Sequence, residues 1–346
     1  MPAQQKALFL TAKHGDWAVG TTDIPTPGTG QLLVKIHSTA LNPLDWKIQA
    51  YGLFIENYPA ILGSDAAGTV EVVGEGVEGF GVGDRGFFTN SFGTYQQYAL
   101  SNADVTAKIP AGMSFDEAAT LPVGVATGAT GLFDQHADDN AQLYPPWEDG
   151  GRGKHAGKSI VIFGGSGSVG QYTIQLAKLA GFAPLIVTAS LRNADVLKAL
   201  GATHVIDRTL PTDVLVEQIK HAAGAPVETV FDTVSSRDTQ NEAFDILAPT
   251  GVLVTVLPDE VDAEKKNAAP GKKVVHVVAN VNLPQKRTAG ISLYKKLASL
   301  LEEGVIKPNH VVIVPGGLSS VPVGLEKLRN GQISAVKLVV RPQESV

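Results

Sequence analysis

The segment Ser159-Ile160-Val161-Ile162-Phe163-Gly164-Gly165-Ser166-Gly167-Ser168-Val169-Gly170 decides the fold of the second half of the chain. Its β-branched run predicts a short buried strand, and glycines follow that strand directly. Behind the glycines, apolar or small residues recur on one helix face, at Val169, Tyr172, Thr173, Leu176, Ala177 and Ala180, and Gly181 ends the pattern. A strand, a glycine turn and a helix in this order open a βαβ unit that binds a nucleotide.

The glycines of this turn are spaced as Gly165-x-Gly167-x-x-Gly170. We expect Gly165 to bend the chain, Gly167 to admit a pyrophosphate against the backbone, and Gly170 to let the helix pack on the strand. Free N–H groups at the positive end of the helix dipole would hold the phosphates. The predicted cofactor-binding residues of the turn are Gly165, Ser166, Gly167, Ser168, Val169 and Gly170.

Length and composition bound the class of protein. A chain of 346 residues is long enough for two domains with a core each. The net charge of −6 gives no reason to expect a nucleic acid or an anionic membrane as partner. No apolar run reaches a membrane span and no signal pattern opens the chain, so we expect a cytoplasmic protein. The absence of cysteine excludes disulfides, thiolate nucleophiles and a zinc site built on sulfur.

The two halves of the chain differ in pattern. Residues 1–125 are β-rich, with a strand over Leu32–Ile36 that should end at Pro43 and architectural glycines from Asp65 to Arg85. After Ser159, helical or turn stretches separate further strand-like runs, at Leu185–Thr188, His204–Ile206, Thr229–Phe231, Val252–Leu257 and Val274–Val278. This alternation predicts a doubly wound, mostly parallel sheet in an α/β protein. The tail should return to the first domain through a helix at Leu293–Glu303.

Between the halves, Leu121–Gly131 predicts a helix of small residues that packs tightly against a neighbour. The following stretch, Asp134–Lys158, is polar and rich in glycine and proline, which predicts a long surface loop. Its length hints at a function, although a decorative insertion fits equally well.

Several motifs together resemble the medium-chain dehydrogenases/reductases. They are Leu41-Asn42-Pro43-Leu44-Asp45-Trp46-Lys47, Gly68-Thr69-Val70-Glu71-Val72-Val73-Gly74, Gly83-Asp84-Arg85, Leu121-Pro122 and the turn Gly164–Gly170. The segment Asn42–Lys47 and the pair Ser190-x-x-Asn193 are most similar to the zinc-free fungal enoyl-reductase-like and quinone-oxidoreductase-like branch. The resemblance implies a GroES-like domain over 1–125 and 288–346 and a Rossmann domain over 126–287.

Zinc-dependent members of that superfamily place a cysteine ahead of a Gly-His-Glu segment and carry a four-cysteine lobe. This chain has Gly63-Ser64-Asp65 at the former, and its eight histidines show no ligand spacing, so we expect no metal. Hydride transfer to an isolated carbonyl concentrates charge on one oxygen, which a metal commonly stabilises. In a conjugated C=C–C=O system the charge spreads as an enolate, so alkene or quinone reduction fits better.

The choice of cofactor is read about twenty residues past the glycine turn, where an acid would bind the ribose of NAD. The chain has Ser190 there, followed by Arg192 and Asn193, and Arg208 comes after the next strand. These residues favour the 2′-phosphate of NADPH over NADH. Ser190 could instead be a helix cap and Arg192 an ordinary solvated side chain.

The resemblance implies further cofactor contacts, at Pro43, Trp46, Lys47, Thr127, Val256, Leu257, Val336 and Lys337. Asp45 and Lys47 could hold each other in a catalytic pose, or form a structural ion pair where the strand ends. The proton donor could be Lys47, Tyr51, Tyr58 or water, and the predicted catalytic residues are Lys47, Asp45 and Tyr58. The aromatic residues Phe54, Tyr58, Phe92 and Tyr95 would line an apolar cleft or belong to the core.

The sequence therefore predicts an NADPH-dependent ene-reductase that saturates small α,β-unsaturated ketones or aldehydes, as a monomer or a homodimer. Three alternatives stay open: a quinone reductase, a trans-acting enoyl reductase of a polyketide pathway, and a non-catalytic NADPH-binding protein. The intact segment Asn42–Lys47 argues against the last of these, because a pure binder has no need of it.

Overall fold

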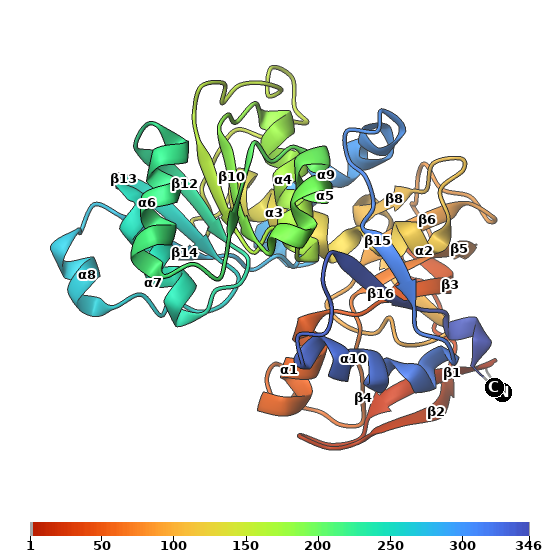
Figure 1. The fold of residues 1–346 in the computed structure, drawn as a ribbon. Coiled ribbons are helices and arrows are strands. Elements are labelled where there is room, and N and C mark those ends of the chain that lie inside the picture. The colour runs from red at the N-terminus through yellow and green to blue at the C-terminus, as the bar shows by residue number, and fades with distance from the viewer. Residues whose placement is uncertain (1–2, 346) are drawn as a thin grey trace. The chain divides into compact units, whose positions relative to one another are not determined.

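The structure, a computed structural model, describes residues 3–345, and contacts within the chain divide it into two units. Unit 1 comprises Met1–Val123, Tyr294–Glu302 and Lys307–Val346, and unit 2 comprises Gly124–Leu293 and Glu303–Ile306. In Figure 1 the strands of unit 2 run from green to cyan, whereas unit 1 joins the red-to-yellow first part of the chain to its blue tail.

Unit 1 is built on two sheets, of order β2-β1-β4 and β15-β16-β3-β5-β6-β8, with β7 paired to β3. Its strands are β1 (Gln4–Leu10), β2 (Trp17–Asp23), β3 (Gln31–Ala40), β4 (Ala60–Ile61), β5 (Asp65–Val73), β6 (Arg85–Thr89), β7 (Tyr98–Asn102), β8 (Thr106–Lys108), β15 (His310–Ile313) and β16 (Val336–Val340). Its helices are α1 (Pro43–Tyr51), α2 (Phe115–Ala119) and α10 (Val321–Arg329). The expected return of the tail is confirmed, because Val339 of β16 pairs with Ala40 of β3.

An irregularity in this sheet explains Gly68, one of the glycines expected to be architectural between Asp65 and Arg85. The register of β3 against β5 shifts twice, and Gly68 stands next to the second shift. A Cβ at Gly68 would lie 2.0 Å from the carbonyl oxygen of Lys35, so only glycine fits there. Proline ends β3 as expected: Asn42 caps α1, Pro43 is its first residue, and Gly52 closes it in a left-handed conformation.

Unit 2 holds a parallel sheet of order β11-β10-β9-β12-β13-β14, which confirms the doubly wound fold. Its strands are β9 (Ile160–Phe163), β10 (Leu185–Ala189), β11 (His204–Asp207), β12 (Val227–Asp232), β13 (Leu247–Thr255) and β14 (Lys273–His276). Its helices are α3 (Pro122–Phe133) from Gly124 onward, α4 (Ser168–Ala180), α5 (Ala194–Leu200), α6 (Thr212–Ala223), α7 (Arg237–Ile246), α8 (Ala263–Ala268) and the first part of α9 (Pro284–Glu302). The strand order reverses between β9 and β12, where such sheets bind nucleotides.

The stretch from 134 to 158 contains no helix or strand, yet it is not a simple surface loop. Asp134 and Trp147 are buried, and the N–H groups of Ala141 and Leu143 donate to carbonyl oxygens in the last turn of α3. The indole N–H of Trp147 donates to Ser292 Oγ on α9 at 2.7 Å. The expected surface loop is therefore wrong in part, since the loop satisfies helix carbonyls and covers an apolar surface.

The helix expected at Leu293–Glu303 begins earlier, at Pro284. Among the described residues, no helix combines the length and the apolar character that crossing a bilayer requires.

Candidate active site

The glycine turn of unit 2 has a geometry that corrects one prediction. Gly164, with φ of +75°, bends the chain, whereas we expected this of Gly165. Gly165 is needed for packing, because a Cβ there would lie 1.9 Å from Val187 Cγ1 on β10. A Cβ at Gly170 would lie 2.5 Å from the carbonyl oxygen of Gly164, so this residue lets α4 approach the turn. A Cβ at Gly167 would meet only that oxygen, at 3.4 Å, which leaves this face open.

The first turn of α4 offers N–H groups to a ligand. Gly167 N–H donates to the Gly164 carbonyl and Gln171 N–H to the Gly167 carbonyl. Between them, the N–H groups of Val169 and Gly170 have no acceptor in the described chain. Gly167 caps the helix without a side chain, and the first turn holds no acid. The positive helix end is therefore not neutralised by the protein, and a pyrophosphate fits it.

A second turn, after β12, supports the glycine turn: Thr233 Oγ1 donates to the carbonyl oxygens of Phe163 and Gly164 at 2.7 and 3.1 Å. Asp232 Oδ1 accepts from the N–H groups of Val234 and Ser235 at 2.9 and 2.8 Å, and burial raises the pKa of Asp232. Ser235 has φ of +55°, and its Oγ accepts from Val256 N–H at 2.9 Å. A cofactor contact of Val256 would thus use its carbonyl or side chain. Asp232 is not among the residues predicted from the sequence, although an acid at the end of a buried strand signals such a turn.

The residues predicted to bind the 2′-phosphate of the cofactor's ribose lie close to the ends of β10 and β11. Ser190 follows β10 directly, and Arg208 N–H donates to the carbonyl of Ala189, the last residue of β10, at 3.1 Å. Ser190 makes no side-chain cap bond, so the cap interpretation finds no support. Arg192 and Arg208 are exposed, and Asn193 is buried.

Asp207, a carboxylate not predicted from the sequence, lies at the same edge. Its Oδ1 accepts from the N–H and the Oγ1 of Thr209, at 3.0 and 2.8 Å, and these bonds lower its pKa. The Asp207 carboxylate is therefore bound within the turn that follows β11.

In unit 1, Lys337, Asn42 and Asp65 form a buried polar triad. Lys337 Nζ donates to Asn42 Oδ1 at 2.6 Å and lies 3.1 Å from Asp65 Oδ2, which also accepts from Asn42 Nδ2 at 2.9 Å. Asp65 Oδ1 accepts from Val123 N–H at 2.7 Å. Both oxygens of Asp65 are thus occupied, whereas the ammonium uses two of its three N–H groups within the described chain.

Asp45 lies beside this triad and faces away from Lys47. Its Oδ2 accepts from Tyr95 Oη at 2.6 Å and from Asn42 N–H at 3.0 Å, and its Oδ1 has no partner in the described chain. The expected pairing of Asp45 with Lys47 is therefore wrong, because residues two apart on a helix point to different sides. Burial raises the pKa of Asp45 to about 6, with Asp65 adding to the shift and the bonds from Tyr95 and Asn42 opposing it.

Lys47 lies on α1 beside the ring of Trp46. Lys47 is half-buried, with Nζ 5.7 Å above the Trp46 ring, and burial lowers its pKa. Trp46 Nε1 and Tyr58 Oη are buried and have no hydrogen-bond partner in the described chain, so a bound ligand is one way to supply a partner.

The other predicted cofactor contacts lie on three elements. Pro43 is the first residue of α1, Val336 is the first residue of β16, and Thr127 is buried in α3.

The aromatic residues of the expected cleft divide between core and surface. Tyr95 is fully buried, and Tyr58 and Phe92 pack on the same apolar cluster. Phe54 is 71% exposed, and Tyr51, predicted as a candidate proton donor and not as a cleft residue, is 60% exposed. Among the described residues no group of three or more histidine or acidic side chains is placed to hold a metal ion.

Comparison with known proteins identifies the family. The profile of the alcohol dehydrogenase GroES-like domain matches residues 28–111, and that of the zinc-binding dehydrogenase domain matches 168–300. The trans-enoyl reductase himH of Aspergillus japonicus is 33% identical over 99% of this chain and 98% of its own. This chain belongs to the medium-chain dehydrogenases/reductases. The resemblance seen at Asn42–Lys47 and at the glycine turn is thereby confirmed.

Two further proteins are similar to this chain along nearly their whole length. A zinc-type alcohol dehydrogenase-like protein of Schizosaccharomyces pombe is 31% identical, over 97% of this chain and 99% of its own. The structure of the quinone oxidoreductase from Coxiella burnetii matches with a TM-score of 0.74 at 25% identity, over 98% of this chain and 99% of that one. The chain is an oxidoreductase by family, and members of this family bind nicotinamide cofactors.

Proposed function

We propose that the protein is an NADPH-dependent reductase that transfers hydride to the β-carbon of α,β-unsaturated ketones or aldehydes and releases the saturated carbonyl. The observation that carries this proposal is the buried ammonium of Lys337, held in place beside Asn42–Lys47 with one N–H to spare. A fixed positive charge suits a reaction whose intermediate carries a delocalised negative charge. The trans-enoyl reductase among the relatives supports the same chemistry.

The residues of unit 2 fit the cofactor. The N–H groups of Val169 and Gly170 would hold the pyrophosphate, and Ser190 with Arg192 and Arg208 would bind the 2′-phosphate. When bound, the nicotinamide of NADPH supplies the hydride.

In unit 1, Lys337 and Lys47 would supply the hydrogen bonds that an enolate oxygen or a cofactor hydroxyl needs. Lys337 is held by Asn42 and Asp65, so its position costs no reorganisation during the reaction. Lys47 is not in an ion pair in the described chain, and burial has already lowered its pKa, so it suits proton donation. Tyr58 remains the alternative proton donor, and the reaction as proposed requires no zinc.

Product analysis with labelled cofactor tests this function. With NADPH carrying deuterium at C4, the label should appear on the carbon β to the carbonyl of an enone, with and without a metal chelator. A label on the carbonyl carbon, or loss of turnover in the chelator, would contradict the proposal. A quinone is the second substrate to assay, because the quinone oxidoreductase of Coxiella burnetii is similar along its whole length.

The cofactor preference gives a second test. We expect NADPH to bind more tightly than NADH by about 1.5–3 kcal/mol, since charge-assisted bonds to the 2′-phosphate would be lost with NADH. Ser190→Asp should reverse the preference by placing a carboxylate against that phosphate. Ala225→Asp is the matched control, because Ala225 precedes β12 and lies at the opposite, amino-end edge of the sheet. Equal affinities of the parent protein for both cofactors would refute the role of Ser190.

A further inference from the structure

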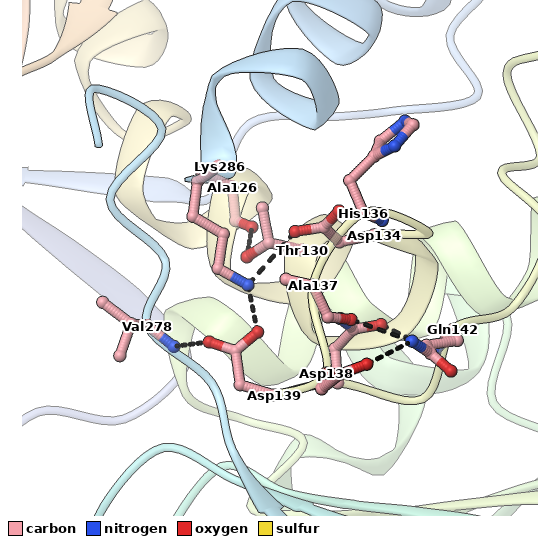
Figure 2. A network of polar contacts seen from close by, with 11 residues as sticks. Ala126, Thr130, Asp134, His136, Ala137, Asp138, Asp139, Gln142, Val278 and Lys286 are labelled. Atoms are coloured by element: carbon pink, nitrogen blue, oxygen red, sulfur yellow. Dashed lines mark hydrogen bonds and ion pairs between the residues drawn. The ribbon is translucent and has the colours of Figure 1, made fainter. Parts of the chain in front are cut away.

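A buried ion cluster joins the loop after α3 to the start of α9. Lys286 Nζ lies 3.1 Å from Asp134 Oδ2 and also binds Asp139 Oδ1, and the Lys286 side chain is 1% exposed. Figure 2 shows the ammonium between the two carboxylates, with the His136 ring turned away from it. Asp134 is held further, because its Oδ1 accepts from His136 N–H at 2.9 Å.

Two charges of this cluster, those of Asp134 and Lys286, do not stabilise the helices that carry them, because each lies at the end of a helix where its sign is unfavourable. Asp134 directly follows the C-terminus of α3, where a negative charge is unfavourable. Lys286 lies in the first turn of α9, where a positive charge is unfavourable. Each charge interacts unfavourably with the dipole of its own helix, and the ion pair between Asp134 and Lys286 offsets both costs.

The cluster holds a segment at the ligand-binding edge of the sheet. Asp139 Oδ2 accepts from the N–H of Val278 at 3.4 Å, a long bond at the rim of the network (Figure 2). Val278 comes two residues after β14 ends, and Val277 N–H still donates to Thr255 at the end of β13. Val278 thus leaves the carboxyl edge of the parallel sheet, the edge at which α/β sheets bind ligands.

The topology tells which half of a dinucleotide this segment would meet. The phosphates belong at the turn after β9, and the 2′-position is read at the end of β10, on one side of β9. Strands β12, β13 and β14 lie on the other side of β9. The nicotinamide half of the cofactor would therefore extend toward the segment that Asp139 holds.

We infer that Asp139, fixed by Lys286, is a positioning residue: it sets the backbone around Val278 where the nicotinamide half of the cofactor would lie. The loop of residues 134–158 then has a function beyond decoration. The inference rests on the proposed function for its ligand, but the contact of Asp139 with Val278 can be tested without it.

Asp139→Asn is the decisive variant, since it keeps the shape of the side chain and leaves the pair of Lys286 with Asp134 intact. One amide oxygen cannot replace both carboxylate oxygens, so backbone exchange at residues 277–283 should accelerate. Turnover and NADPH affinity should fall by about tenfold, because small misplacements near the reacting atoms are costly. Affinity for adenosine 2′,5′-bisphosphate, which lacks the nicotinamide half, should stay unchanged.

Asp138→Asn is the matched control, because Asp138 lies in the same loop and, among residues 3–345, its carboxylate accepts only from Gln142. If both variants behave alike, or if Asp139→Asn weakens NADPH and the bisphosphate equally, the positioning role is refuted. If the parent protein fails to bind NADPH, the proposed function fails, and unchanged hydrogen exchange at 277–283 in Asp139→Asn would independently refute the contact.

Discussion

Replacing Lys337 with methionine is expected to lower the free energy of unfolding by about 3–5 kcal/mol, because it leaves a buried charge without its partner. The Asp65 carboxylate is fully buried and would keep only neutral donors, from Asn42 and Val123. Asn42 Oδ1 would lose its donor as well. Urea denaturation of the variant and the parent protein measures the difference.

Two further variants separate the buried charge from a general loss of lysine. Lys108→Met removes the ammonium of an exposed pair, 3.1 Å from Asp84, and should cost less than about 1 kcal/mol. Adding Asp65→Asn to Lys337→Met removes the uncompensated charge, so the double variant should be more stable than Lys337→Met alone. Equal small losses in Lys337→Met and Lys108→Met would show that the triad does not stabilise unit 1.

Local patterns explain what the sequence predicts correctly. The strand β9, the turn and the helix α4 lie within one short stretch, and Gly181 ends α4 as its position in the pattern indicates. Periodicity and glycine placement act between neighbouring residues, so reading them requires no knowledge of the fold. The assignment of the bend to Gly165 is wrong, because two adjacent glycines look alike in sequence. They differ only in the fold, where Gly164 has the positive φ and Gly165 packs against Val187 on the next strand.

Pairings between distant residues explain what the sequence does not reveal. Tyr95 is 50 positions from Asp45, and Lys337 is 295 positions from Asn42. Asp45 and Lys47 are close along the chain, and this closeness suggested a pair that the turn of α1 separates. Nothing in the sequence distinguishes Lys286, because a single lysine at the start of a helix is ordinary, and only the fold brings Asp134 and Asp139 to it. The residues predicted to contact the cofactor therefore stay predictions until binding is measured.

The stability of the protein should also depend on pH through Asp45, whose pKa burial raises from the ordinary 3.8 to about 6. Between these values the unfolded chain loses the proton while the folded protein keeps it, so the contribution of Asp45 to stability falls as pH rises. The whole loss is about 3 kcal/mol, and roughly half of it lies between pH 5 and 7.5. Above pH 6 the fold holds an ionised carboxylate whose Oδ1 has no partner in the described chain.

Asp45→Asn removes this titration and keeps an oxygen that can accept from Tyr95 and Asn42. The free energy of unfolding of the parent protein, relative to this variant, should therefore fall by about 1–2 kcal/mol between pH 5 and 7.5 in urea denaturation. Asp84→Asn is the control: the bond from Gly81 N–H, more than the bond from Lys108, lowers the pKa of Asp84, so its titration is complete below pH 5. The difference between the parent protein and Asp84→Asn should accordingly stay flat over the same range. A flat difference for Asp45→Asn as well would mean that Asp45 is ionised in the fold throughout, stabilised by Lys337 more strongly than burial opposes it.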